Sequence, residues 1–305
     1  MTRNKAFIVM DVGGTFIKSG LMSADGILID GSQQTVPIDS NGSKEEICNS
    51  LASAVSQGIA LCKQHELIPS GVGICMPGPF NYYTGVSAMV HKFAAIKDIP
   101  LKEIITPALE GLEIPIAFGH DVNTQLYGEV CGGNAKGYAN VCLVSLGTGL
   151  GFALAQEGEV LKSPTGSPLV SIWNLPYNGG ILEDYASKRG FYNTWKMVTG
   201  SRPADDMTVA DMGRLAGEGD KTALKVFETV GKFLACNIKE HLKNHNIECL
   251  LFGGQISRSF RFMEDAVRKE LSDLEGLTIT TVSDFSNAAF KGLVEMLKQH
   301  IHKSI

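Results

Sequence analysis

The sequence lacks the features that would assign it to a membrane, secreted or nucleic-acid-binding class. No run of apolar residues approaches the length of a membrane-spanning helix, and the apolar run near the start is too short for a signal peptide. No long cluster of Lys and Arg accompanies the formal net charge of −5. This charge balance argues against nucleic acid or an anionic membrane as the main partner. We therefore expect a cytoplasmic protein whose partners are small molecules.

Cysteine is present but forms no recognisable pattern. The seven cysteines are scattered, their number is odd, and no two of them form a CxxC pair. Reduced thiols in the core are the simplest interpretation. With 44% hydrophobic and 19% charged residues, the composition is that of an ordinary globular enzyme, and 305 residues favour two domains over one.

The first part of the chain alternates strands with helices, as an α/β protein does. Residues 6–10 and 16–22 are rich in β-formers and flank a glycine turn, which predicts a hairpin. A third strand is expected near Ile27. Apolar residues at helical spacing predict a helix over residues 44–64 that covers one face of the sheet.

The hairpin pattern returns in the second half of the chain. It is followed by several helical stretches and then by a buried strand that ends in two glycines. The predicted segments are a strand at 141–146, a turn at 147–151, a strand at 152–155, helices around 181–198, 209–216 and 222–245, and a strand at 249–252. We expect one lobe at residues 1–118 and a second at 119–287, with a final helix at about 288–305 that packs back on the first lobe.

The first glycine turn can serve phosphate chemistry. Phosphoryl transfer needs backbone N–H groups around phosphates, a carboxylate that manages the metal, and a base aimed at the attacking hydroxyl. In Asp11-Val12-Gly13-Gly14-Thr15 the glycines let the main chain approach a phosphate, the Asp points into the turn, and Thr15 adds a hydroxyl donor. A plain β-hairpin turn explains the motif equally well.

Two further glycine turns and one aspartate complete the pattern. Gly147-Thr148-Gly149 lies between two predicted strands, so it is neither a P-loop nor a dinucleotide fingerprint, both of which precede a helix. Gly253-Gly254-Gln255 follows a buried strand and suits a nucleoside contact. Asp121 precedes a helix, where it fits either a general base or a helix N-cap. The order of these elements is far more specific than any one of them.

In the order of these motifs the sequence resembles the ROK family of sugar kinases and repressors, within the actin, Hsp70 and hexokinase superfamily. The resemblance covers nearly the whole chain. The resemblance implies two ribonuclease-H-like, actin-like ATPase lobes with a cleft between them, and ATP with Mg²⁺ as cofactors. Gly119-His120-Asp121-Val122-Asn123 is similar to the family's END(V/A)N stretch, whose Asp is the catalytic base, so Asp121 inherits that role.

The resemblance also implies which residues bind the ligands. The expected nucleotide-binding residues are Asp11, Gly13, Gly14, Thr15, Lys18, Gly147, Thr148, Gly149, Gly253, Gly254 and Gln255, with Asp11 near Mg²⁺ through phosphates or water. The expected substrate-binding residues are Gly78, Pro79, His120, Asp121 and Glu183.

The sequence departs from the family pattern in three places. Gly119-His120 replaces Glu-Asn, so His120 is either a sugar ligand or a structural histidine. Residues 167–187 contain neither Cys nor His where many members carry a zinc loop, so no zinc is expected. Within that stretch Glu183 matches the family's LExxxS motif, either as a sugar ligand or as a solvated helix residue. The stretch 88–93 lies where glucokinases usually have a PN pair, and its His91 and Lys92 either face a polar or phosphorylated ligand or form an exposed turn.

We expect ATP-dependent phosphorylation of a sugar hydroxyl. In this family the usual acceptor is hexose O6, and glucose, an N-acetylhexosamine and a β-glucoside all remain open. The alternative is a catalytically weak, sugar-sensing regulatory protein of the same fold. DNA binding is not expected, because only a handful of residues precede the first strand, and an ATPase of the chaperone or actin branch is disfavoured. A homodimer is the expected assembly.

Overall fold

The chain divides into two compact units, seen here in a computed structural model that describes residues 4–303, with side chains as far as residue 301. Unit 1 comprises Met1–Cys131, Lys162–Pro168 and Ser286–Ile305, and unit 2 comprises Gly132–Leu161 and Leu169–Phe285. Residues 1–3 and 304–305 lie outside the described part; they belong to unit 1 and, in the expected division, to the first lobe and the helix that returns to it. The expected boundary at residue 118 stays a prediction, although spatial proximity groups residues 119–131 with unit 1.

Unit 1 is built on a five-stranded sheet with the order β3-β2-β1-β4-β7. Strands β1, β2 and β3 pair antiparallel, whereas β4 and β7 run parallel to β1. The strands are β1 (Lys5–Val12), β2 (Phe16–Ser23), β3 (Gln34–Pro37), β4 (Ile68–Cys75) and β7 (Ile116–Gly119). The predicted hairpin is confirmed, but the third strand begins at Gln34, because Ile27 lies after a tight turn at Gly26 (φ 73°) and is 66% exposed.

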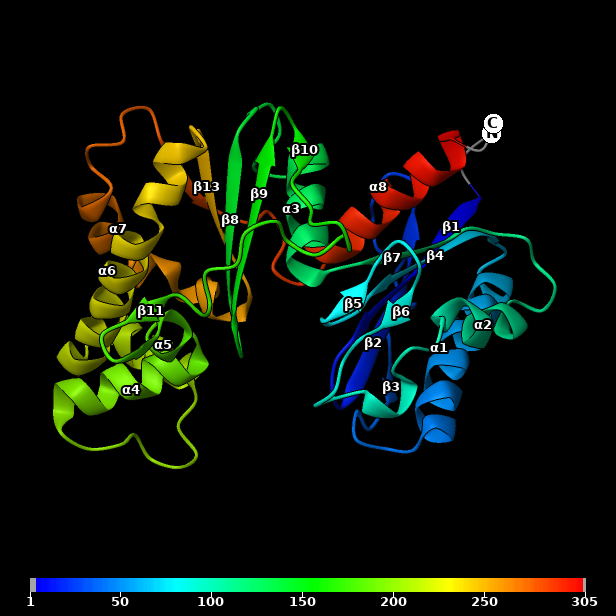
Figure 1. The fold of residues 1–305 in the computed structure, drawn as a ribbon, viewed down its shortest axis with the longest axis horizontal. Coiled ribbons are helices and arrows are strands. Elements are labelled where there is room, and N and C mark those ends of the chain that lie inside the picture. Colours follow the sequence, from blue (N-terminus) through cyan, green and yellow to red (C-terminus); the bar gives the residue numbers. More distant parts are fainter. Residues whose placement is uncertain (1–3, 304–305) are drawn as a thin grey trace. The chain divides into compact units, whose positions relative to one another are not determined.

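Helices pack on both faces of this sheet (Figure 1). Helix α1 (Lys44–Gln64) starts with a capping box in which the Glu46 N–H donates to Ser43 Oγ, and it buries an apolar stripe against β1, β2 and β4. Helix α8 (Ala288–Lys303) covers the opposite face, where Leu293 and Leu297 pack against Phe7 and Val9. The expected return of the last helix to the first lobe stays a prediction, and in the structure α8 packs on the sheet of unit 1.

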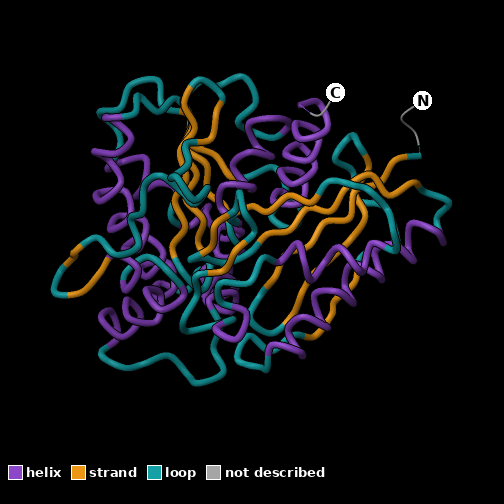
Figure 2. Tube along the Cα trace, turned by 45° about the vertical axis from the view of Figure 1, so that its right-hand side comes forward, coloured by secondary structure: helices purple, strands orange, loops and turns teal. Residues whose placement is uncertain are grey.

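Unit 2 repeats the topology of unit 1 with the strand order β10-β9-β8-β13-β14. Here β8, β9 and β10 are antiparallel, and β13 and β14 run parallel to β8. The strands are β8 (Val141–Leu146), β9 (Leu150–Gln156), β10 (Glu159–Val160), β13 (Cys249–Gly253) and β14 (Thr278–Thr281). Figure 2 shows both sheets with helices beside them. The mixed α/β fold class is therefore confirmed.

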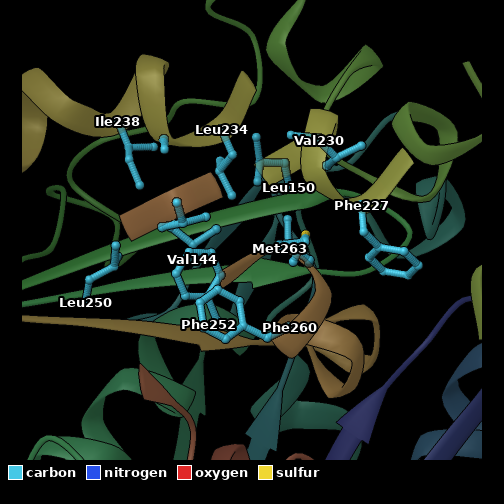
Figure 3. Packing of buried hydrophobic residues seen from close by; sticks show 14 of the residues in the cluster. Val144, Leu150, Phe227, Val230, Leu234, Ile238, Leu250, Phe252, Phe260 and Met263 are labelled. Atoms are coloured by element: carbon cyan, nitrogen blue, oxygen red, sulfur yellow. The ribbon is translucent and has the colours of Figure 1, made fainter. Parts of the chain in front are cut away.

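The core of unit 2 forms between its sheet and helix α6 (Lys221–Asn244). Val230 and Leu234 of α6 pack towards Val144 and Phe252 of the sheet (Figure 3). The rings of Phe252 and Phe260 stack with centroids 4.2 Å apart. Burying such large apolar side chains contributes about 1.5–3 kcal/mol each.

Shorter elements connect these layers. In unit 1 they are β5 (Phe80–Asn81), β6 (Val86–Ser87), η1 (Ala94–Ile96), α2 (Leu101–Ile105), η2 (Thr106–Leu109) and α3 (Asp121–Gly132), whose last residue is assigned to unit 2. In unit 2 they are β11 (Pro176–Tyr177), β12 (Gly180–Ile181), η3 (Leu182–Asp184), α4 (Lys188–Thr199), α5 (Val209–Gly217), η4 (Gln255–Phe262) and α7 (Glu264–Glu270). The helix expected from residue 181 therefore begins only at Lys188. No helix within residues 4–303 is both long and apolar enough to cross a membrane.

Helices α3 and α8 approach each other so closely that only glycine fits at their contact. A Cβ on Gly128 would lie 2.9 Å from Gly292 N and would overlap Ala288 O. A Cβ on Gly292 would overlap Thr124 O. This contact fixes α3, and therefore the residues at its start, against the helix that backs the sheet.

We expect Gly128→Ala to lower the free energy of unfolding by roughly 1–3 kcal/mol, because the added methyl must separate α3 from α8. Gly132→Ala is the matched control, since it lies on the same helix and a Cβ there meets no atom within 4 Å. We expect that control to change stability by less than about 1 kcal/mol. Urea unfolding of the two variants provides the comparison, and equal losses would contradict the close helix contact.

Candidate functional site

The residues predicted to bind ligands fall into two sets, one in each unit. Unit 1 holds its set at and after the carboxyl ends of β1, β4 and β7, the edge where open α/β sheets bind ligands. This set is Asp11, Gly13, Gly14, Thr15, Gly78, Pro79, His120 and Asp121, together with Lys18 near the start of β2, where it pairs with Asp11. Unit 2 holds Gly147, Thr148, Gly149, Glu183, Gly253, Gly254 and Gln255 around the carboxyl ends of β8 and β13.

The turn between β1 and β2 packs against a neighbouring loop through its glycines. The Gly13 N–H donates to Phe16 O at 2.9 Å, and the Ser40 N–H donates to Gly14 O at 2.9 Å. A Cβ on Gly14 would lie 3.3 Å from Ser40 Oγ, which is tighter than ordinary contact. Ser40 O also accepts a hydrogen bond from the Phe93 N–H at 2.6 Å. Ser40 thus links the DxGG turn to the segment that carries Lys92.

Asp11 is the less acidic of the two carboxyl groups at this sheet edge. Burial and, to a smaller extent, the negative charge of Asp121 together raise its pKa from 3.8 to about 6, while Lys18 opposes both effects. Lys18 is the register partner of Asp11 across the β1–β2 hairpin. The Asp11 carboxyl therefore lies where an added cation would be stabilised.

Asp121 is the first residue of α3, and its environment keeps it ionised. The surrounding protein removes water from the carboxylate, which raises its pKa. The His120 imidazole, the Val122 N–H and Lys92 lower the pKa by more, so that it is lowered overall. The Val122 N–H donates to Asp121 Oδ1 at 2.8 Å, and His120 Nδ1 lies 2.7 Å from the same oxygen. A helix N-cap side chain would instead accept from the second or third N–H of the helix.

The Asp121 side chain remains open to a ligand even though one of its oxygens is engaged. It is 68% exposed. Both contacts fall on Oδ1, and no described residue forms a hydrogen bond with Oδ2. An ionised, accessible oxygen on a rigid helix start is what a general base requires.

His120 lies between Asp121 and the substrate loop predicted after β4. Its ring meets the Tyr82 ring edge-on with centroids 5.7 Å apart, and Tyr82 Oη donates to Met76 O at 2.8 Å. A Cβ on Gly78 would lie 3.9 Å from His120 Cδ2. The structure therefore brings Gly78, His120 and Asp121 together and places Tyr82 beside them.

Lys92 belongs to this group, although the sequence left it open between a ligand contact and an exposed turn. It is half-buried, burial lowers its pKa, and the negative charge of Asp121 raises it. The next residue, Phe93, is fully buried and has a left-handed backbone with φ 53°. Buried Met89, Phe93 and Ile96 anchor this segment. Their apolar spacing around Lys92 was the available signal for a fixed lysine.

In unit 2 the Gly147–Gly149 turn is shaped by Glu183. The Leu150 N–H donates to Glu183 Oε2 at 3.0 Å, and a Cβ on Gly149 would lie 2.9 Å from the same oxygen. Arg189 Nη2 is 3.5 Å from the other carboxylate oxygen of Glu183. Glu183 is therefore a partner of the glycine turn and not a solvated helix residue.

The second pair of glycines in unit 2 packs directly behind the first turn. Gly254 has φ 78°, and a Cβ there would overlap Leu146 O, so both its conformation and its contact demand glycine. Gln255 Nε2 donates to Phe285 O at 3.0 Å. Beyond Gln255 a cavity of about 330 Å³ is lined partly by Arg214, Arg258 and Arg261. Sequence reasoning missed this cavity, because α5 and η4 that form it are distant along the chain.

The residues present fit a magnesium ion held largely by a nucleotide. Carboxylate and phosphate oxygens are the ligands that Mg²⁺ prefers, and the raised pKa of Asp11 marks a carboxyl group that a cation would stabilise. Within the described residues no group of three or more His, Cys, Asp or Glu side chains could hold a metal alone. Phosphates and water would therefore supply most of the ligands.

Comparison with known proteins settles the family. The model of the ROK family matches residues 7–168 and 176–288. The chain belongs to the ROK family. It is 24% identical to a glucokinase of Halalkalibacterium halodurans over 275 residues, covering 83% of this chain and 81% of that protein. It is also 24% identical to the xylose repressor of Bacillus spizizenii over 274 residues, covering 87% of this chain and 68% of the repressor.

A solved structure of a ROK family member shares the fold. The ROK family glucokinase of Streptomyces griseus, solved with glucose and AMPPNP, superposes with a TM-score of 0.78 at 18% identity, covering 96% of this chain and 99% of that one. Together with the family match, this confirms the resemblance inferred from the glycine turns and the GHD motif. Kinases and repressors are both among the relatives, so the family does not by itself define an activity.

Replacing Asp11 by Asn should stabilise the protein more at pH 8 than at pH 4. A carboxyl group whose pKa is higher in the folded state favours folding through its protonated form, so this contribution is lost as pH rises from about 4 through about 6. Asn cannot ionise, and we expect a gain of at most about 3 kcal/mol at pH 8.

Urea unfolding of wild type and Asp11→Asn, at both pH values and without divalent cations, measures this difference. Asp30→Asn is the control, because Asp30 is an exposed aspartate of unit 1. A gain of equal size at both pH values would contradict the raised pKa of Asp11.

Proposed function

We propose that the protein is an ATP-dependent kinase that phosphorylates a sugar hydroxyl, with Asp121 as the general base. The observation that carries the proposal is the pair of unlike carboxyl groups in unit 1. Asp121 is ionised and exposed, whereas the pKa of Asp11 is raised to about 6. Carboxyl groups whose environments push their pKa values apart are typical of sites that divide two chemical roles.

Asp121 would take the proton of the acceptor hydroxyl on Oδ2. The Val122 N–H donates to Oδ1 and His120 Nδ1 lies 2.7 Å from it, so the carboxylate would keep one orientation while Oδ2 faces the hydroxyl. The proton moves from the hydroxyl to Oδ2 as the oxygen attacks the γ-phosphorus, the bond from that phosphorus to the β–γ bridging oxygen breaks, and ADP leaves. The α3–α8 contact keeps the start of the helix, and with it this oxygen, in place.

Unit 2 would bind the nucleotide through main-chain groups. The Gly147–Gly149 turn, braced by Glu183, offers N–H groups to phosphates, and Gly254 closes the turn from behind. The cavity beyond Gln255 would receive the nucleoside, with Arg258 held by Gln255 Oε1 at 2.8 Å. The Streptomyces griseus relative was solved with AMPPNP, which supports ATP as the donor.

Asp11 and Lys92 would act on the charge of the transferring group. Asp11 would hold Mg²⁺ through phosphates or water, and the ion when bound would neutralise charge on the β- and γ-phosphates. Lys92 would add a fixed positive charge near Asp121. Gly78, Pro79 and His120 would contact the sugar.

Replacing Asp121 by Asn should abolish most turnover while sparing substrate binding, because the amide keeps the shape but cannot accept the proton as a base. We expect kcat to fall by roughly 10²–10⁴-fold with little change in sugar affinity. The measurement is ADP release with Mg-ATP and glucose, mannose, fructose, N-acetylglucosamine, N-acetylmannosamine or cellobiose as acceptor.

Asp30→Asn serves again as the matched control and should leave kcat unchanged. A sugar-dependent signal that survives in Asp121→Asn would refute the assignment of the base. A silent wild type that still binds a sugar or ATP by calorimetry would refute the kinase proposal for this panel and favour the regulatory alternative.

The alternative is a sugar-sensing regulatory protein with weak or no catalysis. The similarity to the xylose repressor supports it, as does the replacement of the family's Glu-Asn by Gly119-His120. The ionised Asp121 counts against it. We further propose a cytoplasmic location. We also propose a homodimer, which light scattering would test.

A further inference from the structure

Unit 1 contains a cavity of about 310 Å³ beside β7, the edge strand of its sheet. Strand β7, helices α3 and α8, Tyr82-Tyr83 and the segment 162–168 provide its walls. His120 is one of the residues that line it, whereas Asp121 is not. The cavity is therefore separated from the proposed base by the imidazole of His120.

The segment 162–168 is fixed over the cavity by hydrogen bonds to its surroundings. Asn123 Nδ2 donates to Gly166 O at 3.1 Å, and the Tyr82 N–H donates to Thr165 O at 2.8 Å. A Cβ on Gly166 would lie 2.9 Å from Tyr82 Cβ, so glycine is needed for this approach. The walls are thus preformed, as ligand sites usually are.

The lining has the chemistry of a site for an organic anion. Four aromatic rings line the walls, from Tyr82, Tyr83, Phe118 and Tyr127. Two exposed lysines at its edge, Lys102 and Lys162, supply positive charge, and no described residue that lines the cavity carries a carboxylate. Flat apolar groups pack on such rings, and a negative group finds ammonium partners at the rim.

His120 is positioned to respond to a ligand in the cavity. One side of its ring faces the cavity and meets Tyr82, while Nδ1 lies 2.7 Å from Asp121 Oδ1. A ligand that packs against this ring can move the imidazole, and with it the Nδ1 atom that lies beside Asp121 Oδ1. The cavity and Asp121 are therefore connected through one side chain.

We propose that this cavity binds a small organic anion with a flat apolar body, such as an aromatic carboxylate, and that His120 couples its occupancy to Asp121. The cavity borders the proposed sugar site at His120 and Tyr82, but Asp121 does not line it. Its binding activity does not depend on the protein being a kinase.

The first experiment compares binding of 2-naphthoate and of its neutral analogue 2-naphthamide by calorimetry, with the whole protein and without sugar or ATP. We expect the anion to bind at least tenfold more tightly than the amide. The Lys102→Gln/Lys162→Gln variant should lose at least tenfold in affinity for the anion, because both positive charges at the rim are removed. Lys5→Gln/Lys44→Gln is the matched control from the same unit, since both of these lysines are exposed and neither lines the cavity.

Three outcomes would overturn the site. Equal affinity for naphthoate and naphthamide would refute the anionic class of ligand. Equal losses in the two double variants would show binding governed by net charge. Absence of binding at millimolar concentrations would refute the site itself, and none of these outcomes depends on kinase turnover.

The second experiment tests the coupling by NMR. The Cε1–H resonance of His120 is assigned by its absence in His120→Gln. We expect saturating 2-naphthoate to shift this resonance in wild type and in Lys5→Gln/Lys44→Gln, but not in Lys102→Gln/Lys162→Gln at the same ligand concentration. An unmoved His120 resonance at confirmed saturation would refute the coupling.

Discussion

Two carboxyl groups at one edge of a sheet set the electrostatics of unit 1. The negative charge of Asp121 adds to burial in raising the pKa of Asp11, so the two groups cannot both be ionised near neutral pH without cost. The arrangement around them reduces this cost unequally: His120, the Val122 N–H and Lys92 all favour ionised Asp121, whereas Lys18 alone is the cation that favours ionised Asp11. The site therefore holds one carboxylate that stays ionised, Asp121, and one carboxyl group that a bound cation would stabilise in its ionised form, Asp11.

Glycine is what allows the backbone of both units to approach its neighbours closely enough to build these sites. Gly14 packs against Ser40 in unit 1, and Gly254 packs against Leu146 in unit 2. The two sheets share one strand order, so the same kind of turn follows the first strand of each. What differs is the carboxyl side chain beside each turn. In unit 1 it is Asp11, which directly precedes the turn, and in unit 2 it is Glu183, which comes from a distant segment and accepts from the Leu150 N–H. A repeated scaffold can thus present two different surfaces.

The sequence predicted those parts of the fold that depend on local pattern. Strand β1 with its glycine turn, helix α1 with its capping Ser43, and the repeat of the hairpin at Gly147 are all encoded within short windows. It failed where a tertiary contact decides the outcome. Ile27 reads as a strand residue but follows a turn, and Lys92 gains its place from the burial of Phe93 and from Ser40, which lies more than fifty residues earlier. The cavity beside β7 was equally invisible, because segments distant along the chain line it.

The change from Glu-Asn to Gly119-His120 alters more than a hydrogen-bonding partner. His120 contacts the base itself, since its Nδ1 lies 2.7 Å from Asp121 Oδ1, and its ring meets Tyr82 and lines the cavity beside β7. Gly119 has no side chain, and a Cβ there would overlap Thr124 Cγ2, so the first substitution also lets α3 begin tightly against β7. Both substitutions bring Asp121 into contact with a residue of the cavity wall, His120. The proposed base is thereby linked to the cavity beside β7.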